Sequence, residues 1–592
     1  MSLVLAFVAA PRLAHAEWLS AGGVKAGVVM AGAAEFDITP RIKSFVDRNG
    51  NGRHDMGDPT QPFDLGEPVL EFEDGPIYVG NGSGLATHVH GPLKVGALVV
   101  EDPRTGVRIA LVSTDLYMVL QADTDAIRKL VGATADIDFI LLGSTHTHMG
   151  PDTIGLMGLS DVKPVDFPKI LWGEMEAKSG VNHVWFDWMM RQTARAIEQA
   201  AFTMMPATVR VSRTKFSFGM TDEREPHIID DDLMTLAVDA LDGKPIATVV
   251  QGTCHPESIL LNGDPRYTLL EPASVPEEAK KAWGHIITPG FPGWVRKTIR
   301  DRRGGTPLYF SGALGGMITN ITSKIWDPEQ HPEYPTTADP KTVPDSVKVS
   351  PDMRFEVIQG REMAKAALAS LENAKPASTA DVSFDRETIL VPLENPLFRL
   401  TGGLGIMGHT PSMLYDDEGK PDPRTKRGLK GMVFTGVEIP KGANMKTEVS
   451  VVNIGPAQFL AMPGELFGEL SVALPDDFVT NEERYFPKDR KKHAHGEALR
   501  FQFPPLKKQA TRPYPFIVCL AGNDLGYIIP EVDFKPPHEI PVPPLAFWWI
   551  SLDASASAHY EESMTAGSKL EERIIGGLTR LLNRQRHYDS AD

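Results

Sequence analysis

The sequence predicts an α/β protein. Apolar, β-branched runs of strand length recur along its 592 residues, and each run ends in small or turn-forming residues. Stretches with helical periodicity lie between these runs, and alternation of the two kinds of element is typical of α/β folds. The clearest strand candidates are Arg108–Val119, Asp138–His146, Ile246–His255, Pro307–Gly316, Ala457–Glu465 and Phe516–Asp524.

The helix candidates are recognised by apolar residues at steps of four. Residues 184–202 carry such a face, formed by Trp185, Met189, Thr193, Ile197 and Ala201. Residues 356–374 and 569–585 show a similar pattern. The polar, proline-containing stretch 326–351 predicts a long loop instead.

Residues 1–16 are interpreted as a signal peptide. The apolar stretch Leu3–Ala10 is followed by Ala14, His15 and Ala16, which form a small-x-small cleavage pattern. We therefore expect cleavage after Ala16 and a secreted or periplasmic mature protein, residues 17–592.

Composition limits the partners of the chain. A net charge of −17 excludes nucleic acid as the main partner, because no excess of Lys and Arg is available for phosphates. The apolar run Pro544–Leu552 is too short to span a membrane, and we expect it either in the core or as a lip in peripheral contact with a lipid surface. Cys254 and Cys519 are compatible with one disulfide or with two buried thiols. The oligomeric state is left open.

Several predicted strands end in residues that can bind a metal or take part in catalysis. His146 and His148 follow one strand, His255 ends a second, and Glu465 and Tyr527 follow two more. Loops at the ends of strands are where α/β proteins place their sites. Residues two apart in an extended segment point the same way, so both histidines of the pair can face one cavity.

Each of these residues also has an ordinary structural interpretation. The two histidines could be hydrogen-bonded loop residues. Glu465 could be an acid favoured at a helix N-terminus, and Tyr527 a core tyrosine with a bonded hydroxyl. Their common position at strand ends favours a site.

The order of several motifs resembles the neutral (non-lysosomal) ceramidase family. The segments are AEFDITP, HGPLKVGALVVEDP, VSTDLYMV, GSTHTHMGPD, GTCHPESILLNGD, MPGELFGEL, GNDLGYIIPEVDF and HYEESMTAG, spread over residues 34–580. The resemblance implies a catalytic domain with a large mixed sheet. It also implies that the family's C-terminal immunoglobulin-like domain is absent here.

The same resemblance implies a zinc-dependent amidohydrolase. The family's zinc ligands fall on His146, His255, Glu465 and Tyr527, and a residue that helps catalysis falls on His148. Groups near the substrate amide match Arg224 and Tyr560, and Thr319 stands where the family has a serine.

The implied chemistry is hydrolysis of the amide bond of ceramide or a related N-acyl lipid. Zinc polarises a carbonyl and lowers the pKa of water to about 7. Arg224 or Tyr560 would stabilise the developing oxyanion, and His148 would supply the proton that the leaving amine needs. The alternatives are an esterase or lactonase at the same site and a catalytically silent lipid-binding protein.

Departures from the family pattern concern substrate fit. Met149 and Asp152 replace a serine and a glycine after the histidine pair, and the HGPLK segment lacks the family's arginine. We expect Asp152 at the mouth of the site to disfavour anionic head groups.

A second metal motif lies in an insertion at about residues 41–75. Residues 47–58, DRNGNGRHDMGD, have oxygen-bearing groups at the spacing of a twelve-residue calcium loop, with Gly52 at the sharp turn. The expected ligands are Asp47, Asn49, Asn51, Asp55 and Asp58 through their side chains and Arg53 through its carbonyl. The prediction is structural calcium; the alternative is a turn without metal.

Overall fold

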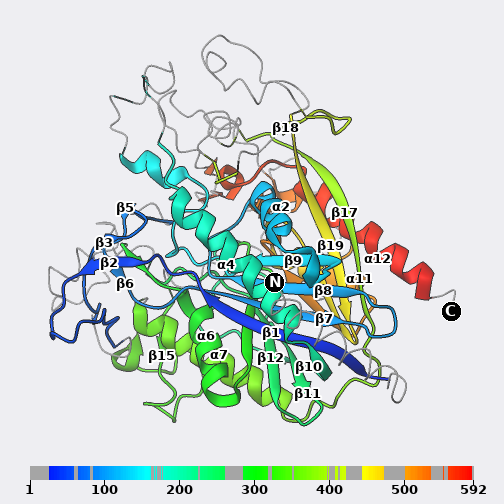
Figure 1. Cartoon of the computed structure of the whole chain (residues 1–592), viewed down its shortest axis with the longest axis horizontal. Helices are drawn as coiled ribbons and strands as arrows, with labels where there is room; N and C mark the ends of the chain where they lie inside the picture. The colour runs from blue at the N-terminus through cyan, green and yellow to red at the C-terminus, as the bar shows by residue number, and fades with distance from the viewer. Residues whose placement is uncertain are drawn as a thin grey trace, which may run out of the picture.

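The chain folds around two β-sheets that pack face to face, shown by a computed structural model (Figure 1). The structure describes residues 26–58, 64–80, 84–161, 178–224, 227–259, 285–317, 323–349, 352–395, 407–410, 414–421, 443–472, 501–534 and 561–589, with a few isolated residues and short pairs between them.

The larger sheet has eight strands of mixed direction. Its order is β14 (Thr306–Ser311), β12 (Pro245–Gly252), β11 (Asp232–Ala240), β10 (Met205–Lys215), β1 (Val28–Asp37), β7 (Lys94–Glu101), β8 (Arg108–Thr114) and β9 (Phe139–Ser144). The outer pairs β12–β14 and β8–β9 are parallel, and the other neighbours are antiparallel.

The second sheet is smaller and packs on one face of the first. It contains β17 (Val382–Pro392), β19 (Asn444–Ile454), β20 (Ala457–Ala461) and β22 (Tyr514–Val518), with β18 (Leu414–Tyr415) on the edge of β19. Only β20 and β22 are parallel neighbours. Leu98 and Leu236 of the larger sheet share a buried cluster with Val452 and Phe516 of the smaller one, so apolar burial holds the sheets together.

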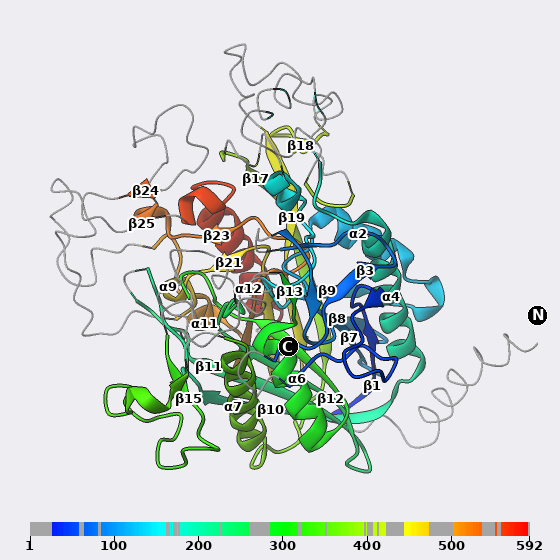
Figure 2. The ribbon, with the colours of Figure 1, turned by 90° about the vertical axis from the view of Figure 1, so that its left-hand side faces the viewer.

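Helices cover the two outer faces of this sandwich (Figures 1 and 2). The larger sheet carries α4 (His183–Phe202), α6 (Gly290–Arg303) and α7 (Met353–Leu371), while α12 (Gly576–Asp589) packs on the smaller sheet. The alternation of strand side chains explains this: Val99 of β7 faces α4 and its neighbour Leu98 faces the other sheet. Trp185 of α4 is fully buried, and its indole N–H donates to the carbonyl of Ile38 at 2.9 Å.

Short helices and pairs of short strands lie outside the two main sheets. The helices are α2 (Gln121–Leu130), α9 (Gly468–Ser471) and α11 (Leu506–Gln509). Paired short strands are β2 (Ile42–Phe45) with β3 (Val69–Phe72), β4 (Tyr78–Val79) with β5 (Gly84–Leu85), β6 (His88–Val89) with β13 (Ile286–Ile287), β15 (Ile325–Trp326) with β16 (Lys348–Val349), β21 (Glu465–Leu466) with β23 (Tyr527–Ile528), and β24 (Ser551–Leu552) with β25 (Ala558–His559).

The predicted α/β class and its elements are confirmed. All six strand candidates overlap a strand of one of the two sheets, and the three helix candidates correspond to α4, α7 and the helical segment ending in α12. Cys254 and Cys519 are both buried and form no disulfide, so the disulfide alternative is wrong. Among the described residues, none of the helices is long and apolar enough to cross a membrane.

The carboxyl ends of β14, β9 and β22 are joined to one another. Ser311, the last residue of β14, donates its hydroxyl to the carbonyl of Thr145 after β9 at 3.0 Å. The Cys519 N–H after β22 donates to the Ser311 carbonyl at 2.9 Å. Gly143 of β9 makes this junction compact, since a Cβ there would lie 2.7 Å from the Phe310 ring. The segments leaving these strands therefore converge at one edge.

A buried acid on α7 hydrogen-bonds to residues near this edge. Its raised pKa predicts that the stability of the protein depends on pH. Glu356 is fully buried and accepts hydrogen bonds from the hydroxyls of Ser258 and Thr288, at 3.0 and 3.1 Å. Burial raises its pKa from 4.5 to about 7. At a pH between these two pKa values, Glu356 is protonated in the folded protein and ionised in the unfolded chain. The free energy of unfolding therefore falls as the pH rises through this window, by up to about 3 kcal/mol from this group.

Replacing Glu356 with glutamine should remove this contribution. We expect Glu356→Gln to show a smaller loss of stability between pH 5 and pH 7.5 than the wild type in urea unfolding. Glu372→Gln, at an exposed acid that follows the same helix, is the matched control. An equal pH dependence in wild type, variant and control would contradict the account.

Candidate metal centre

His146 is held in place by its backbone, its ring nitrogen and a tyrosine. It follows β9 by two residues in the left-handed region, with φ of 64°, which is uncommon for a residue other than glycine. Its N–H donates to the carbonyl of Leu116 at 3.0 Å, and its Nδ1 donates to that of Tyr117 at 2.9 Å. The Tyr117 ring stacks on the imidazole at 4.5 Å between centroids. These contacts fix the tautomer, so that Nε2 carries the lone pair.

His148 lies on the next turn of the same loop. Its backbone N–H donates to the carbonyl of Pro256 at 3.3 Å, which ties this loop to the one after β12. Its Nδ1 is 3.6 Å from Oε2 of Glu257, and its Nε2 is buried without a hydrogen-bond partner. Burial and the neighbouring imidazoles of His146 and His255 lower the pKa of His148 well below its usual value, so the ring is neutral.

His255 reaches the same place from β12, three residues after the end of the strand. Its backbone N–H and its Nδ1 both contact the carbonyl of Met317, at 3.2 and 3.1 Å. Its Nε2 is then left facing Oε2 of Glu465 at 2.9 Å. If Nδ1 carries the proton, two lone pairs face each other across this short distance. Such a contact requires a proton or a cation between the two atoms.

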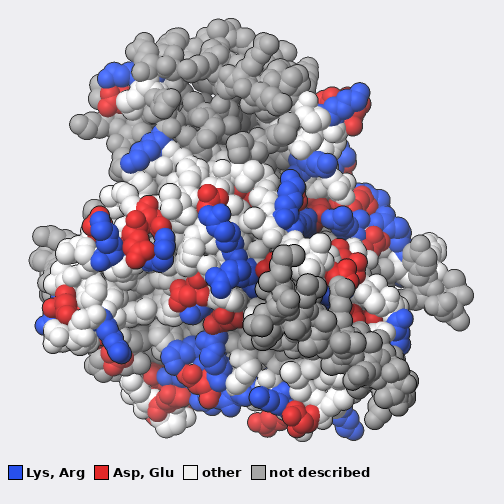
Figure 3. All heavy atoms as spheres, in the orientation of Figure 1, with Lys and Arg blue, Asp and Glu red and all other residues white. Residues whose placement is uncertain are grey.

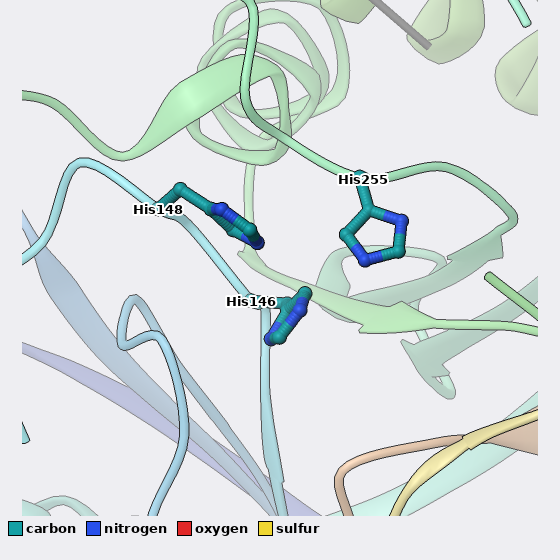
Figure 4. A group of neighbouring side chains, drawn as sticks. All are labelled: His146, His148 and His255. Carbon is teal, nitrogen blue, oxygen red and sulfur yellow. The ribbon is translucent and has the colours of Figure 1, made fainter. Parts of the chain in front are cut away.

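The three imidazoles form one group (Figure 4). Their ring centroids are 4.7 Å apart for His146 and His148, 4.9 Å for His146 and His255, and 5.5 Å for His148 and His255. One nitrogen from each lies within 4.8 Å of the others, a separation that a single metal ion can bridge. The structure therefore brings together three of the residues that the sequence analysis placed at strand ends.

Glu465 and Tyr527 come together through a short parallel strand pair. They are direct partners in the β21–β23 register, and the tyrosine side chain hydrogen-bonds to the carboxylate. The other carboxylate oxygen, Oε1, is 3.7 Å from Nε2 of His146. Burial raises the pKa of Glu465 to about 8, because an ionised carboxylate without a cation is costly there. The Tyr527 ring is 6.3 Å from that of His255.

This donor set fits a metal ion. The Nε2 atoms of His146 and His148 are buried without a hydrogen-bond partner, although buried polar atoms are normally satisfied. Imidazole nitrogen with carboxylate oxygen is the combination that zinc prefers, and the Nδ1 hydrogen bonds of His146 and His255 are of the kind that orient metal-binding histidines.

Three further residues belong to the centre that the sequence analysis did not single out. Tyr117 contacts both histidines of the pair. Glu257 is buried with Oε1 unpartnered, and burial raises its pKa to about 7. Burial and the Glu465 carboxylate raise the pKa of Asp524 to about 8. Each lies within six residues after the end of β8, β12 or β22, and position near the end of a strand is the signal that could have indicated them.

Arg224 occupies a buried ion cluster next to this centre. All three guanidinium nitrogens have partners: Nε and Nη2 donate to Asp533, at 3.1 and 2.8 Å, and Nη1 donates to Glu561 at 3.0 Å. Glu562 accepts from Nη1 and Nη2. The side chain also lies over the Phe467 ring, 5.3 Å from its centroid. In this arrangement, Arg224 holds the acidic residues together. Its N–H groups already donate to these residues, so in this structure none is directed to an oxyanion as the sequence analysis expected.

Asp152 has a structural role that the sequence analysis did not expect. Its carboxylate is buried and accepts the backbone N–H groups of Ile154, Gly155 and Met157 at 2.8 to 3.0 Å. The side chain therefore fixes the turn after the histidine pair. The expectation that it faces a substrate head group is wrong for this structure, because both oxygens are used by the turn.

The predicted calcium loop brings most of its candidate ligands together. Asp55 Oδ2 accepts from the side-chain amides of both Asn49 and Asn51, the latter at 3.0 Å. The Asp47 carboxylate accepts the N–H groups of Gly50 and Gly52 at 2.6 and 2.8 Å. Arg53 donates its N–H to Asn51 Oδ1, and the Asp58 N–H donates to Asp64. Gly52 has φ of 72°, as the sharp turn requires.

Some predicted residues cannot be placed. Thr319, Tyr560, the signal peptide 1–16 and residues 544–550 of the apolar run lie outside the described residues. Their predicted roles stay predictions.

Comparison with solved structures identifies the type of fold. The crystal structure of neutral ceramidase from Pseudomonas aeruginosa matches with a TM-score of 0.52 over 94% of this chain and 74% of that chain, at 13% identity. A ceramidase complexed with C2 matches with a TM-score of 0.51 over 94% and 75%, also at 13% identity. The fold resembles that of neutral ceramidases. By sequence, the chain matches no family model and no curated protein. Similarity to solved structures therefore also confirms the predicted mixed-sheet α/β fold.

Proposed function

We propose that the protein is an exported zinc-dependent amidohydrolase that acts on ceramide or a related N-acyl lipid. The observation that supports this most strongly is the buried group of three imidazoles beside Glu465, in which the Nε2 atoms of His146 and His148 lack a hydrogen-bond partner. The ceramidase-like fold supports the amide as the bond and an N-acyl lipid as the substrate class.

In this proposal, the zinc ligands are His146, His255, Glu465 and Tyr527. Glu465 is the central residue, because its two oxygens lie 3.7 and 2.9 Å from the Nε2 atoms of His146 and His255. Tyr527 hydrogen-bonds to the same carboxylate from the neighbouring strand. Zinc bound here would polarise an amide carbonyl and lower the pKa of a water molecule.

His148 would handle protons beside this centre. Its neutral ring presents the unpartnered Nε2, which can accept a proton and later return it to the leaving amine. Glu257, 3.6 Å from Nδ1, would hold the imidazole in orientation and stabilise it when charged. Tyr117, in edge contact with His148 and stacked on His146, fixes the spacing of the pair.

The test of the proposed reaction is a comparison of amide and ester substrates. Zinc-loaded protein should release the fatty acid from N-acyl amides with a kcat/KM well above that of His148→Ala. If the protein cleaves esters or lactones but no amide, the alternative function, an esterase or lactonase at the same site, is favoured. Absence of turnover of every class by zinc-loaded protein would favour a lipid-binding protein.

The loop of residues 47–58 is proposed to bind calcium as a structural ion. The hydrogen bonds that hold Asp47, Asn49, Asn51 and Asp55 in one turn support this proposal, since calcium takes carboxylate and amide oxygens from such a loop. We expect Asp47→Ala with Asp55→Ala to abolish a calcium-dependent rise in melting temperature. Glu73→Ala, at an exposed acid of the same insertion that pairs with Arg41 and contacts none of the proposed ligands, should keep this rise. If calcium leaves the melting temperature of the wild type unchanged, the loop is an ordinary turn.

A further inference from the structure

Residues 407–410 connect two segments that leave the metal centre. The Gly408 N–H donates to the carbonyl of Ile154 at 2.9 Å, in the turn that follows the histidine pair. The Thr410 N–H donates to Oδ1 of Asp123 at 2.7 Å, in the first turn of α2. Asp123 is fully buried, and the side chain of Thr410 hydrogen-bonds to it as well. These four residues therefore join the turn after the histidine pair to the start of α2.

His409 attaches the same four residues to α4. Its ring stacks on that of Phe186 at 4.7 Å between centroids, and its Nε2 is 3.0 Å from Oδ1 of Asp187. Its Nδ1 is 2.9 Å from Nδ1 of His183, the first residue of α4. Because a carboxylate only accepts, Nε2 of His409 carries a proton and donates it to Asp187. In the neutral ring Nδ1 then accepts, so His183 donates its Nδ1–H to it.

The contact between the two Nδ1 atoms tolerates one positive charge but not two. Protonation of His183 at Nε2 leaves its Nδ1–H directed at His409. Protonation of His409 as well places an N–H group on both Nδ1 atoms, and two donors then face each other across 2.9 Å. Asp187 and His183 approach different nitrogens of His409, so the three side chains do not converge as ligands of a metal ion do. A proton therefore decides whether this contact forms.

The charged groups around the pair set the direction of the pH effect. Burial and the His409 imidazole lower the pKa of His183 from its usual 6.5, against the attraction of Asp187 and Asp123. The helix N-terminus also disfavours a cation at the first residue of α4. Acidic and basic side chains are interspersed over the described part of the face where Figure 1 shows α4, so these near groups decide (Figure 3). The contact is complete above pH 6.5 and is lost as the pH falls below it.

We propose that residues 407–410 form a pH-sensitive clasp on α4, α2 and the turn after the histidine pair, closed at neutral pH and released when His183 and His409 are both protonated. Release would disconnect that turn from the start of α2, on both sides of the metal centre. The clasp depends on neither zinc nor the proposed reaction. Glu356 makes the whole fold more stable at low pH, so local release on acidification is distinguishable from global unfolding.

Amide hydrogen exchange of the full chain at pH 7.5 and pH 5.0 tests this proposal. Each exchange rate is divided into the intrinsic rate at the same pH, so that the resulting protection factor reports on structure alone. In the wild type, we expect the protection of the Gly408 and Thr410 amides to fall at least tenfold at pH 5.0. The protection of the Ile197 amide, inside α4, should not fall.

Variants of the two histidines separate the clasp from other effects of acid. His183→Asn can offer an N–H or an oxygen to His409 but cannot be protonated, so both amides should keep their protection at pH 5.0 within twofold. His409→Ala should lower their protection at least tenfold already at pH 7.5. His331→Gln, in the 326–351 loop, should behave as the wild type does. Equal protection of the wild type at both pH values, an undiminished fall in His183→Asn, or unchanged protection in His409→Ala would each overturn the proposal.

Discussion

Replacing His146 or His255 with alanine is expected to remove zinc from the protein. Both imidazoles keep a lone pair for the metal because their Nδ1 atoms contact backbone carbonyls, of Tyr117 and Met317. Both lie against opposite oxygens of Glu465. Loss of either ligand should lower zinc affinity by more than the 10- to 100-fold typical of supporting residues.

The measurement is elemental analysis of dialysed protein at defined free zinc. Wild type should hold one zinc per chain and each variant close to none. His331→Ala, at a histidine far along the chain in the 326–351 loop, is the matched control and should keep the ion. Full zinc retention in both variants would show that these histidines are packing residues.

Replacing His148 with alanine should separate catalysis from metal binding. In the proposed ligand set, His148 stands beside the zinc, so its loss should leave zinc content unchanged. Removal of a positioned proton carrier typically costs 10²–10⁴-fold in rate, and we expect a fall in kcat of about this size with little change in KM. Steady-state kinetics on an N-acyl amide, together with elemental analysis, gives both values.

The same variant distinguishes two ways of binding the metal. The three histidine nitrogens lie within 4.8 Å of one another, which also allows a three-histidine site. In that arrangement, His148→Ala would lose zinc and activity together. Glu257→Gln should have a smaller effect on kcat than His148→Ala, since it acts through the orientation of the imidazole. A larger effect of Glu257→Gln at full zinc content would reassign the proton carrier.

Local patterns in the sequence were sufficient to predict the main strands and helices. They also placed His146 and His148 in a loop that follows a strand. The run before His146 became β9 and the run before His255 became β12, because buried parallel strands read as continuous apolar segments. Their ends meet across the molecule, where the His148 N–H donates to the carbonyl of Pro256; β9 and β12 run in opposite directions in the sheet, so strand direction alone did not predict this.

Long-range pairing could not be predicted in the same way. The Glu465–Tyr527 register joins residues 62 positions apart through strands of two residues each, too short to leave a periodic pattern. The partners of Arg224 come from residues 533, 561 and 562, and no local signal relates them to position 224. Asp152 was misjudged because its residue type alone does not show that three nearby N–H groups turn towards it.

In the proposed function, zinc held by this centre is required for hydrolysis of an amide. The most direct measurement is the release of fatty acid from one N-acyl amide by the same preparation before metal removal, after chelation and after return of one zinc equivalent. Chelated protein should lose at least 99% of its kcat, and zinc should restore it in wild type but not in His255→Ala. Calcium alone should restore nothing. Undiminished amide hydrolysis by zinc-free protein, or equal restoration in His255→Ala, would contradict the account.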